Sequence, residues 1–113
     1  MTLHHNLDGG DISLEIDIDQ GARISSLNFR GMECVLPFRG QTLTWGWYAM
    51  APWAGRIRDG LIKDQSGTEF QLPTNLAPPH AIHGFTLIQP WQELGTGYFG
   101  IDFPDPYLGA RLE

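Results

Sequence analysis

The sequence predicts an all-β protein whose antiparallel strands form a β-sandwich. The 14 glycines and 8 prolines make up about a fifth of the 113 residues, against roughly an eighth in an average protein, so no window is free for a long helix. Residues 12–19, ISLEIDID, alternate apolar and polar side chains without a break, the pattern of a strand with one buried and one solvated face. Many short strands separated by turn residues favour a sandwich or a barrel.

Five more strand-forming segments follow, each bordered by residues that favour turns. They are residues 24–29, 32–36, 61–63, 68–72 and 99–103. The connection Asp64-Gln65-Ser66-Gly67 is polar and ends in glycine, which suits a hairpin between 61–63 and 68–72. The length of the chain predicts one domain.

Charge and hydropathy exclude several classes of partner. The net charge is −6 and the seven basic residues are dispersed, so no surface for nucleic acid or anionic lipid is expected. The apolar runs are far shorter than the roughly 20 residues that span a membrane, and the N-terminus lacks the pattern of a signal peptide. With a single cysteine, these features predict a cytoplasmic protein. Within the apolar run 34–36, Cys34 is expected to be buried and unreactive.

Residues 95–100, GTGYFG, match the G-x-G-x-x-G pattern of dinucleotide-binding folds. In those folds the pattern opens a helix whose N-terminus holds the pyrophosphate. Here an alternating segment with Pro104 and Pro106 follows, which excludes such a helix. We therefore expect a glycine-rich turn between strands.

The stretch PPHAIHGF, residues 78–85, places His80 and His83 three positions apart in a rigid loop. Imidazole is a common metal ligand, yet a zinc or iron centre needs three or four ligands. Residues 75–90 contain no carboxylate and Cys34 is remote, so no metal is expected here. The spacing alone leaves two roles open, catalysis and hydrogen bonds that hold the loop in shape.

Residues 51–60, APWAGRIRDG, combine Arg56 with three nearby tryptophans. This mixture suits a sugar, because an aromatic face packs on the C–H side of the ring while a planar guanidinium donates to hydroxyl groups. A structural interpretation is also open, with Trp53 in the core and a surface ion pair between Arg58 and Asp59.

Five motifs resemble the aldose 1-epimerase (galactose mutarotase) family in order and spacing. They are GARISSL (21–27), PWAGRIRDG (52–60), LPTN (72–75), HAIHG (80–84) and PW (90–91). The resemblance extends from about residue 10 to about residue 106. It implies that residues 1–113 form the N-terminal part of a single β-supersandwich domain, truncated relative to the family's enzymes.

The resemblance also implies a reaction, the interconversion of the α and β anomers of a free hexose such as glucose or galactose. The family uses neither cofactor nor metal. A general acid protonates the ring oxygen while a general base removes the C1 hydroxyl proton, the ring opens, and closure on the other face gives the second anomer. Groups that titrate near the working pH serve best in both directions.

Three residues take roles from the resemblance. Arg56 matches the family's substrate-binding arginine, and His83 matches an active-site histidine that binds the sugar and stabilises charge at its ring oxygen. His80 falls where relatives often carry asparagine, which implies that it shapes the loop or contacts a hydroxyl. Gly55 departs from the asparagine that commonly precedes the arginine.

The family's general acid histidine and catalytic glutamate lie beyond the segments matched here, which implies that the 113 residues alone are inactive and expose faces prone to self-association. Two alternatives remain open. One is a non-catalytic carbohydrate-binding β-sandwich. The other is a hexose-6-phosphate 1-epimerase, for which Arg58 and Lys63 are candidate phosphate contacts.

Overall fold

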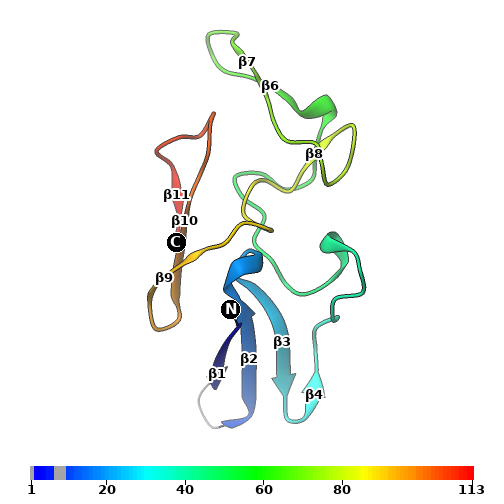
Figure 1. Cartoon of the computed structure of the whole chain (residues 1–113), viewed down its shortest axis with the longest axis vertical. Coiled ribbons are helices and arrows are strands. Elements are labelled where there is room, and N and C mark those ends of the chain that lie inside the picture. The colour runs from blue at the N-terminus through cyan, green and yellow to red at the C-terminus, as the bar shows by residue number, and fades with distance from the viewer. Residues whose placement is uncertain (1, 7–9) are drawn as a thin grey trace.

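The chain folds into short antiparallel strands joined by loops and 3-10 turns (Figure 1). The computed structural model describes residues 2–6 and 10–113, and these residues contain no α-helix. The largest sheet has the order β1 (Thr2–Asn6), β2 (Ile12–Asp17), β3 (Arg23–Phe29), β4 (Met32–Glu33). A second has the order β11 (Arg111–Leu112), β10 (Tyr98–Asp102), β9 (Gln92–Gly95). Two smaller sheets pair β5 (Arg56–Ile57) with β8 (Ala81–Ile82), and β6 (Leu61–Lys63) with β7 (Glu69–Gln71). The predicted all-β, antiparallel class is confirmed.

The strongest strand signal of the sequence lies in the four-stranded sheet, where β2 pairs with β3 along its whole length. The predicted strand 12–19 ends earlier, at Asp17. The Asp17 side chain accepts a hydrogen bond from the Asp19 backbone N–H and so caps the 3-10 turn Ile18–Gln20. Gly21, with φ 83°, then ends that turn.

β4 ends earlier than the predicted strand 32–36, because the Glu33 side chain takes over the hydrogen bonding. Its carboxylate accepts hydrogen bonds from the backbone N–H groups of Leu27 and Val35, each at 3.0 Å. It also accepts one from the Ser26 hydroxyl at 2.5 Å. A side chain that satisfies backbone donors in this way offers an alternative to the ladder.

These bonds lower the pKa of Glu33, the Ser26 bond being the largest cause. The stabilisation is therefore fully present above the carboxyl pKa of the unfolded chain and is lost as the pH falls through the pKa of the folded chain. We expect the amide proton chemical shifts of Leu27 and Val35 to change with one shared midpoint, at a pH below the ordinary glutamate range, as measured by nitrogen–proton NMR. The Glu33→Gln chain should lack this titration. Different midpoints for the two amides would show that they do not share this carboxylate.

Cys34 is exposed, so the prediction of a buried cysteine is wrong. Successive residues of an extended segment face opposite sides. Val35 takes the inward position and is 4% exposed, whereas Leu36 on its other side is 66% exposed. An apolar run of three residues therefore buries only its middle member here.

Two hairpins extend from the centre of the molecule (Figure 1). In the turn between β6 and β7, one Asp64 oxygen accepts hydrogen bonds from the N–H groups of Ser66 (2.8 Å) and Thr68 (2.9 Å). The turn between β9 and β10 contains Gly97 at φ 70°. The predicted hairpin and the predicted glycine-rich turn at 95–100 are both confirmed.

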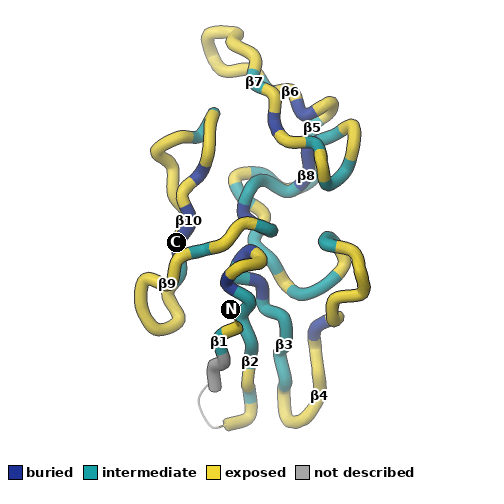
Figure 2. The backbone as a smooth tube through the Cα atoms, viewed as in Figure 1, coloured by how far each residue is buried: buried dark blue, intermediate teal, exposed yellow. Residues whose placement is uncertain are grey.

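Residues 84–91, here called the central segment, run from β8 to β9 through the middle of the molecule with little regular structure (Figure 1). They pass from buried to exposed on the way to β9 (Figure 2). The Phe85 N–H donates to the Ala51 carbonyl at 2.8 Å, and the Gln89 carbonyl accepts from the Gly21 N–H at 3.0 Å. The central segment thus ties the four-stranded sheet to the loop around Ala51. The buried side chains of the described residues are Ile18, Arg23, Val35, Leu72, Ala81, Ile82, Thr86, Leu87, Ile101 and Phe103.

The molecule is elongated, with extents of 53 × 30 × 20 Å and a radius of gyration of 16.1 Å. A compact domain of this length has a radius of gyration of about 13 Å. Several large apolar side chains are exposed between residues 29 and 50, namely Phe29, Met32, Leu36, Phe38, Trp47 and Met50. Exposed apolar faces favour association, and self-association stays a prediction.

Among the described residues, no helix has the length and apolar character needed to cross a bilayer.

Candidate functional site

β5 and β8 bring together the two loops that carry the predicted sugar-binding residues. Arg56 lies opposite Ile82, and Ile57 lies opposite Ala81, in antiparallel register. Ala81 and Ile82 are buried whereas Arg56 is exposed, so the sheet anchors the backbone of Arg56 and leaves its side chain accessible. His83 follows directly after β8, so it lies near Arg56 at one end of this small sheet.

His83 is held by two hydrogen bonds to Gly55. The His83 backbone N–H donates to the Gly55 carbonyl, and the Gly55 N–H donates to Nδ1 of the imidazole, each at 3.0 Å. Because a backbone N–H can only donate, Nδ1 presents a lone pair and the neutral ring carries its proton on Nε2. The loop therefore sets the tautomer of His83, with the proton on Nε2.

The glycine at position 55 has a backbone explanation. Gly55 adopts φ 84°, in the left-handed region. Glycine enters this region without strain, and asparagine enters it more readily than most other residues. Glycine in place of the family's asparagine therefore preserves the turn in which the Gly55 N–H donates to His83.

The backbone is also left-handed at His83 (φ 58°) and Gly84 (φ 75°). A Cβ atom on Gly84 would lie 1.9 Å from the Ala51 carbonyl oxygen, so only glycine fits this close approach. A non-glycine residue with such a φ is uncommon, and strained positions of this kind cluster at ligand-binding sites. The contact with Ala51 thus fixes the position of His83.

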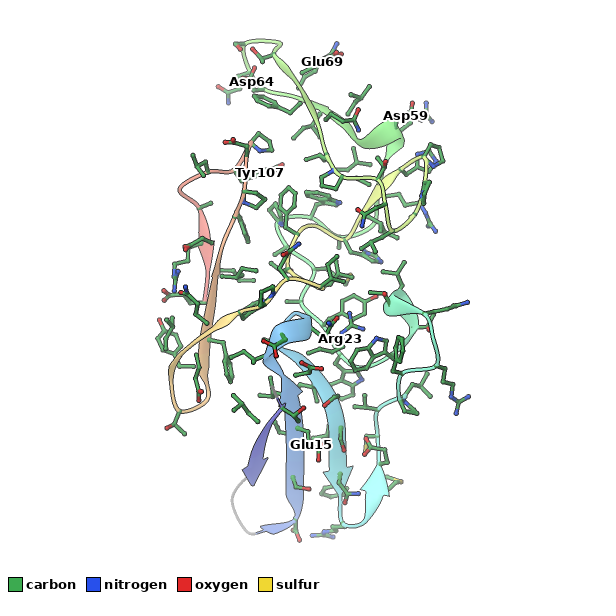
Figure 3. The ribbon with its side chains drawn as sticks, viewed as in Figure 1. Glu15, Arg23, Asp59, Asp64, Glu69 and Tyr107 are labelled. Atoms are coloured by element: carbon green, nitrogen blue, oxygen red, sulfur yellow. The ribbon has the colours of Figure 1, made fainter. Side chains whose placement is uncertain are left out.

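Nδ1 of His80 accepts a hydrogen bond from the Asp59 backbone N–H at 3.0 Å. Asp59, labelled in Figure 3, has φ 56° and lies in the 3-10 turn Arg58–Gly60 that follows β5. His80 therefore helps to hold this turn in shape, and its contact with a sugar hydroxyl stays a prediction. Among the described residues, no group of three or more His, Cys, Asp or Glu side chains is arranged to hold a metal ion.

Two aromatic side chains, Tyr48 and Trp53, lie at these loops. Tyr48 flanks His83, with ring centroids 6.3 Å apart. Trp53 is half-buried and packs edge-on against Phe85 at 5.1 Å, so it is only partly a core residue. Its Nε1 is buried without a hydrogen-bond partner. Trp47 is 52% exposed and offers an aromatic face to solvent.

Arg23 also belongs to this neighbourhood, although no local sequence pattern marks it as a site residue. Its side chain is fully buried near the centre of the molecule (Figure 3). Nη1 donates to the carbonyls of Thr42 (2.7 Å) and Trp45 (2.8 Å), and Nη2 donates to the Leu87 carbonyl (2.9 Å). The guanidinium carbon lies 4.3 Å from the ring centroid of Trp45 and 4.4 Å from that of Tyr48.

Arg23 contacts the site through Tyr48, because the Tyr48 ring that it packs against also flanks His83. Burial lowers the pKa of Arg23, yet a guanidinium stays charged in proteins. The sequence signal for this role was weak, since an arginine at the start of a strand is usually exposed.

The cations considered for a sugar phosphate lie on different elements. Lys63 belongs to β6 and pairs with Glu69 at 3.4 Å across the hairpin. Arg58 is exposed and lies in the turn that His80 holds. The structure therefore brings Arg56 near His83 but does not gather Arg58 and Lys63 on one element.

No protein-family profile matches the chain, and a search of curated proteins found no match. Among solved structures, the chain is similar to the crystal structure of a "putative aldose 1-epimerase" from Escherichia coli K12, with a TM-score of 0.71 and 20% sequence identity. The similarity covers 93% of this chain and 38% of that chain, so this chain spans well under half the length of the protein that it matches. At this identity the likeness concerns the fold. The chain therefore has the aldose 1-epimerase type of fold that its five motifs predict.

Proposed function

We propose that the chain is part of an aldose 1-epimerase and that Arg56 and His83 contact the sugar. The observation that carries this proposal is the pair of hydrogen bonds between Gly55 and His83, which hold the imidazole beside the residue that precedes Arg56. The similarity in fold to an epimerase supports the same family of reactions. A free hexose such as glucose or galactose is the proposed substrate.

In this proposal the Arg56 guanidinium donates to two sugar hydroxyls and the Nε2–H of His83 donates to the ring oxygen. A neutral imidazole whose Nδ1 accepts from Gly55 can donate a hydrogen bond, but giving up the Nε2 proton would leave an anionic ring. His83 therefore stabilises charge at the ring oxygen while another group delivers the proton, as a neutral histidine does in other isomerases. The family pattern assigns that delivery to a second histidine and the removal of the C1 hydroxyl proton to a glutamate, both beyond the matched segments.

The Arg56→Lys chain is expected to bind glucose or galactose more weakly by about 1–3 kcal/mol, because lysine keeps the charge but loses the planar fork that donates to two oxygens. Titration calorimetry or ligand-detected NMR measures the change. Arg30→Lys is the matched control, since Arg30 is exposed in the turn between β3 and β4 and pairs with Asp11 at 3.1 Å. Equal affinities for the Arg56→Lys and unchanged chains would remove Arg56 from the site.

A non-catalytic carbohydrate-binding β-sandwich is the second candidate, favoured by the engaged Nδ1 of His83.

On either proposal the 113 residues alone are expected to leave the mutarotation of freshly dissolved α-glucose at its rate in buffer. The family's principal acid and base lie beyond the matched segments, and acid and base catalysis each contribute on the order of 10²–10⁴-fold. Polarimetry measures this rate. An acceleration that His83→Ala abolishes would mean that the chain carries its own acid and base. The rate measured for a longer chain that also carries the family's second histidine and glutamate separates the two candidates, because only an epimerase accelerates mutarotation.

A further inference from the structure

We propose that the chain has a second saccharide-binding site, in the cavity between the 3-10 turn Ile18–Gln20 and the loop 38–45. The cavity has a volume of about 380 Å³ and is lined by Asp17, Gln20, Phe38, Thr42 and Trp45. This volume lies within the range of about 300–1,000 Å³ that is usual for small-molecule sites. Its lining shares no residue with the Arg56 and His83 site, so the two sites can be tested separately.

The aromatic wall of this cavity is fixed in place. Trp45 packs on the Arg23 guanidinium at 4.3 Å, and Phe38 meets the Trp45 ring edge-on at 5.5 Å. Arg23 also donates to the backbone carbonyls of Thr42 and Trp45, so one buried side chain positions two of the five lining residues. Because these side chains are already ordered, a ligand that binds to them loses little affinity to side-chain entropy.

The opposite side of the cavity is polar. One Asp17 oxygen accepts the Asp19 N–H at 3.2 Å, and a carboxylate has further lone pairs that can accept sugar hydroxyls. The Gln20 amide and the Thr42 hydroxyl can both donate and accept. A ligand with several hydroxyl groups on its rim can therefore find both donors and acceptors here.

The charges around the cavity favour a neutral ligand. The net charge of −6 and the Asp17 carboxylate disfavour an anion. The Arg23 guanidinium already lies against Trp45, so a second cation at that ring would meet like charge. A saccharide ring offers an apolar C–H face for Trp45 and Phe38 and hydroxyls for the polar side, which is the combination that this lining fits.

The test uses methyl α-glucopyranoside, a glycoside that cannot open its ring, and saturation-transfer NMR, which does not require a monomeric chain. We expect saturation of the C–H protons of the glycoside, persisting in the Arg56→Met chain. Adding Phe38→Ala or Gln20→Ala to that chain should weaken binding about tenfold, the loss of one good contact. Gln20 is exposed and Phe38 is 59% exposed, so both variants should keep the fold, as checked by circular dichroism.

Three outcomes would overturn the proposal. One is the absence of saturation transfer in the folded chain. Another is binding that Arg56→Met removes but Phe38→Ala and Gln20→Ala leave unchanged, which would assign the glycoside to the proposed epimerase site. The third is saturation of tetramethylammonium but not of the glycoside, which would make the cavity a cation site.

Discussion

The Arg23→Met chain is expected to lose about 3–5 kcal/mol of unfolding free energy, because three backbone carbonyls lose their hydrogen bonds to a charged donor. Methionine fills much of the same space but donates no hydrogen bond. The carbonyls of Thr42, Trp45 and Leu87 would each lose the donor that the buried guanidinium supplies. An unfolding free energy of roughly 5–15 kcal/mol is usual for a domain, so the loss is a large part of the total.

Urea unfolding followed by tryptophan fluorescence measures this loss. Arg30→Met is the matched control, because Arg30 is 67% exposed in its side chain and its ion pair with Asp11 is on the surface. Such a pair contributes about 0–1 kcal/mol, so the control should unfold almost like the unchanged chain. Similar losses for the two variants would mean that the carbonyls around Arg23 find water or other donors.

The Gly84→Ala chain is expected to lose at least about 3 kcal/mol, because two effects that each destabilise a fold act at one position. The residue has φ 75°, which alanine rarely adopts, and its Cβ would lie 1.9 Å from the Ala51 carbonyl oxygen. The backbone must move to remove this clash, and His83 is the adjoining residue. Loss of the proposed sugar binding should therefore accompany the loss of stability.

Gly67→Ala separates backbone strain from the clash. Gly67 has φ 86° in the turn between β6 and β7, and a Cβ atom added there would meet nothing within 4 Å beyond its chain neighbours. This control should cost only the strain of a left-handed alanine, about 1–2 kcal/mol. If urea unfolding gives the same free energy for both alanine variants, the backbone around Ala51 moves at little cost and does not fix the position of His83.

The sequence predicted the parts of the fold that depend on local pattern. The alternation in 12–19 and the segment 24–29 correspond to β2 and β3, and the polar turn after Lys63 forms the expected hairpin. These signals work because the side-chain period of a strand and the preferences of turn residues act over a few positions. For the same reason they gave no warning that Glu33 would shorten β4.

The candidate site was only partly predictable. The motif resemblance selected Arg56 and His83, yet no local rule pairs β5 with β8 or gives the Gly55 N–H to an imidazole. The burial of Arg23 depends on carbonyls from two distant loops, and the exposure of Cys34 depends on which way a short edge segment faces. Such contacts are set by tertiary packing, which a single sequence does not display.

The bonds of the central segment also bear on the order in which the chain can fold. The hydrogen bond between Arg23 and the Leu87 carbonyl joins residues 64 positions apart, whereas each hairpin closes a short local loop. Contacts of large sequence separation form late, because their loop-closure entropy must be met first. The hairpins can therefore nucleate independently, while the His83 loop becomes ordered only when the central segment docks.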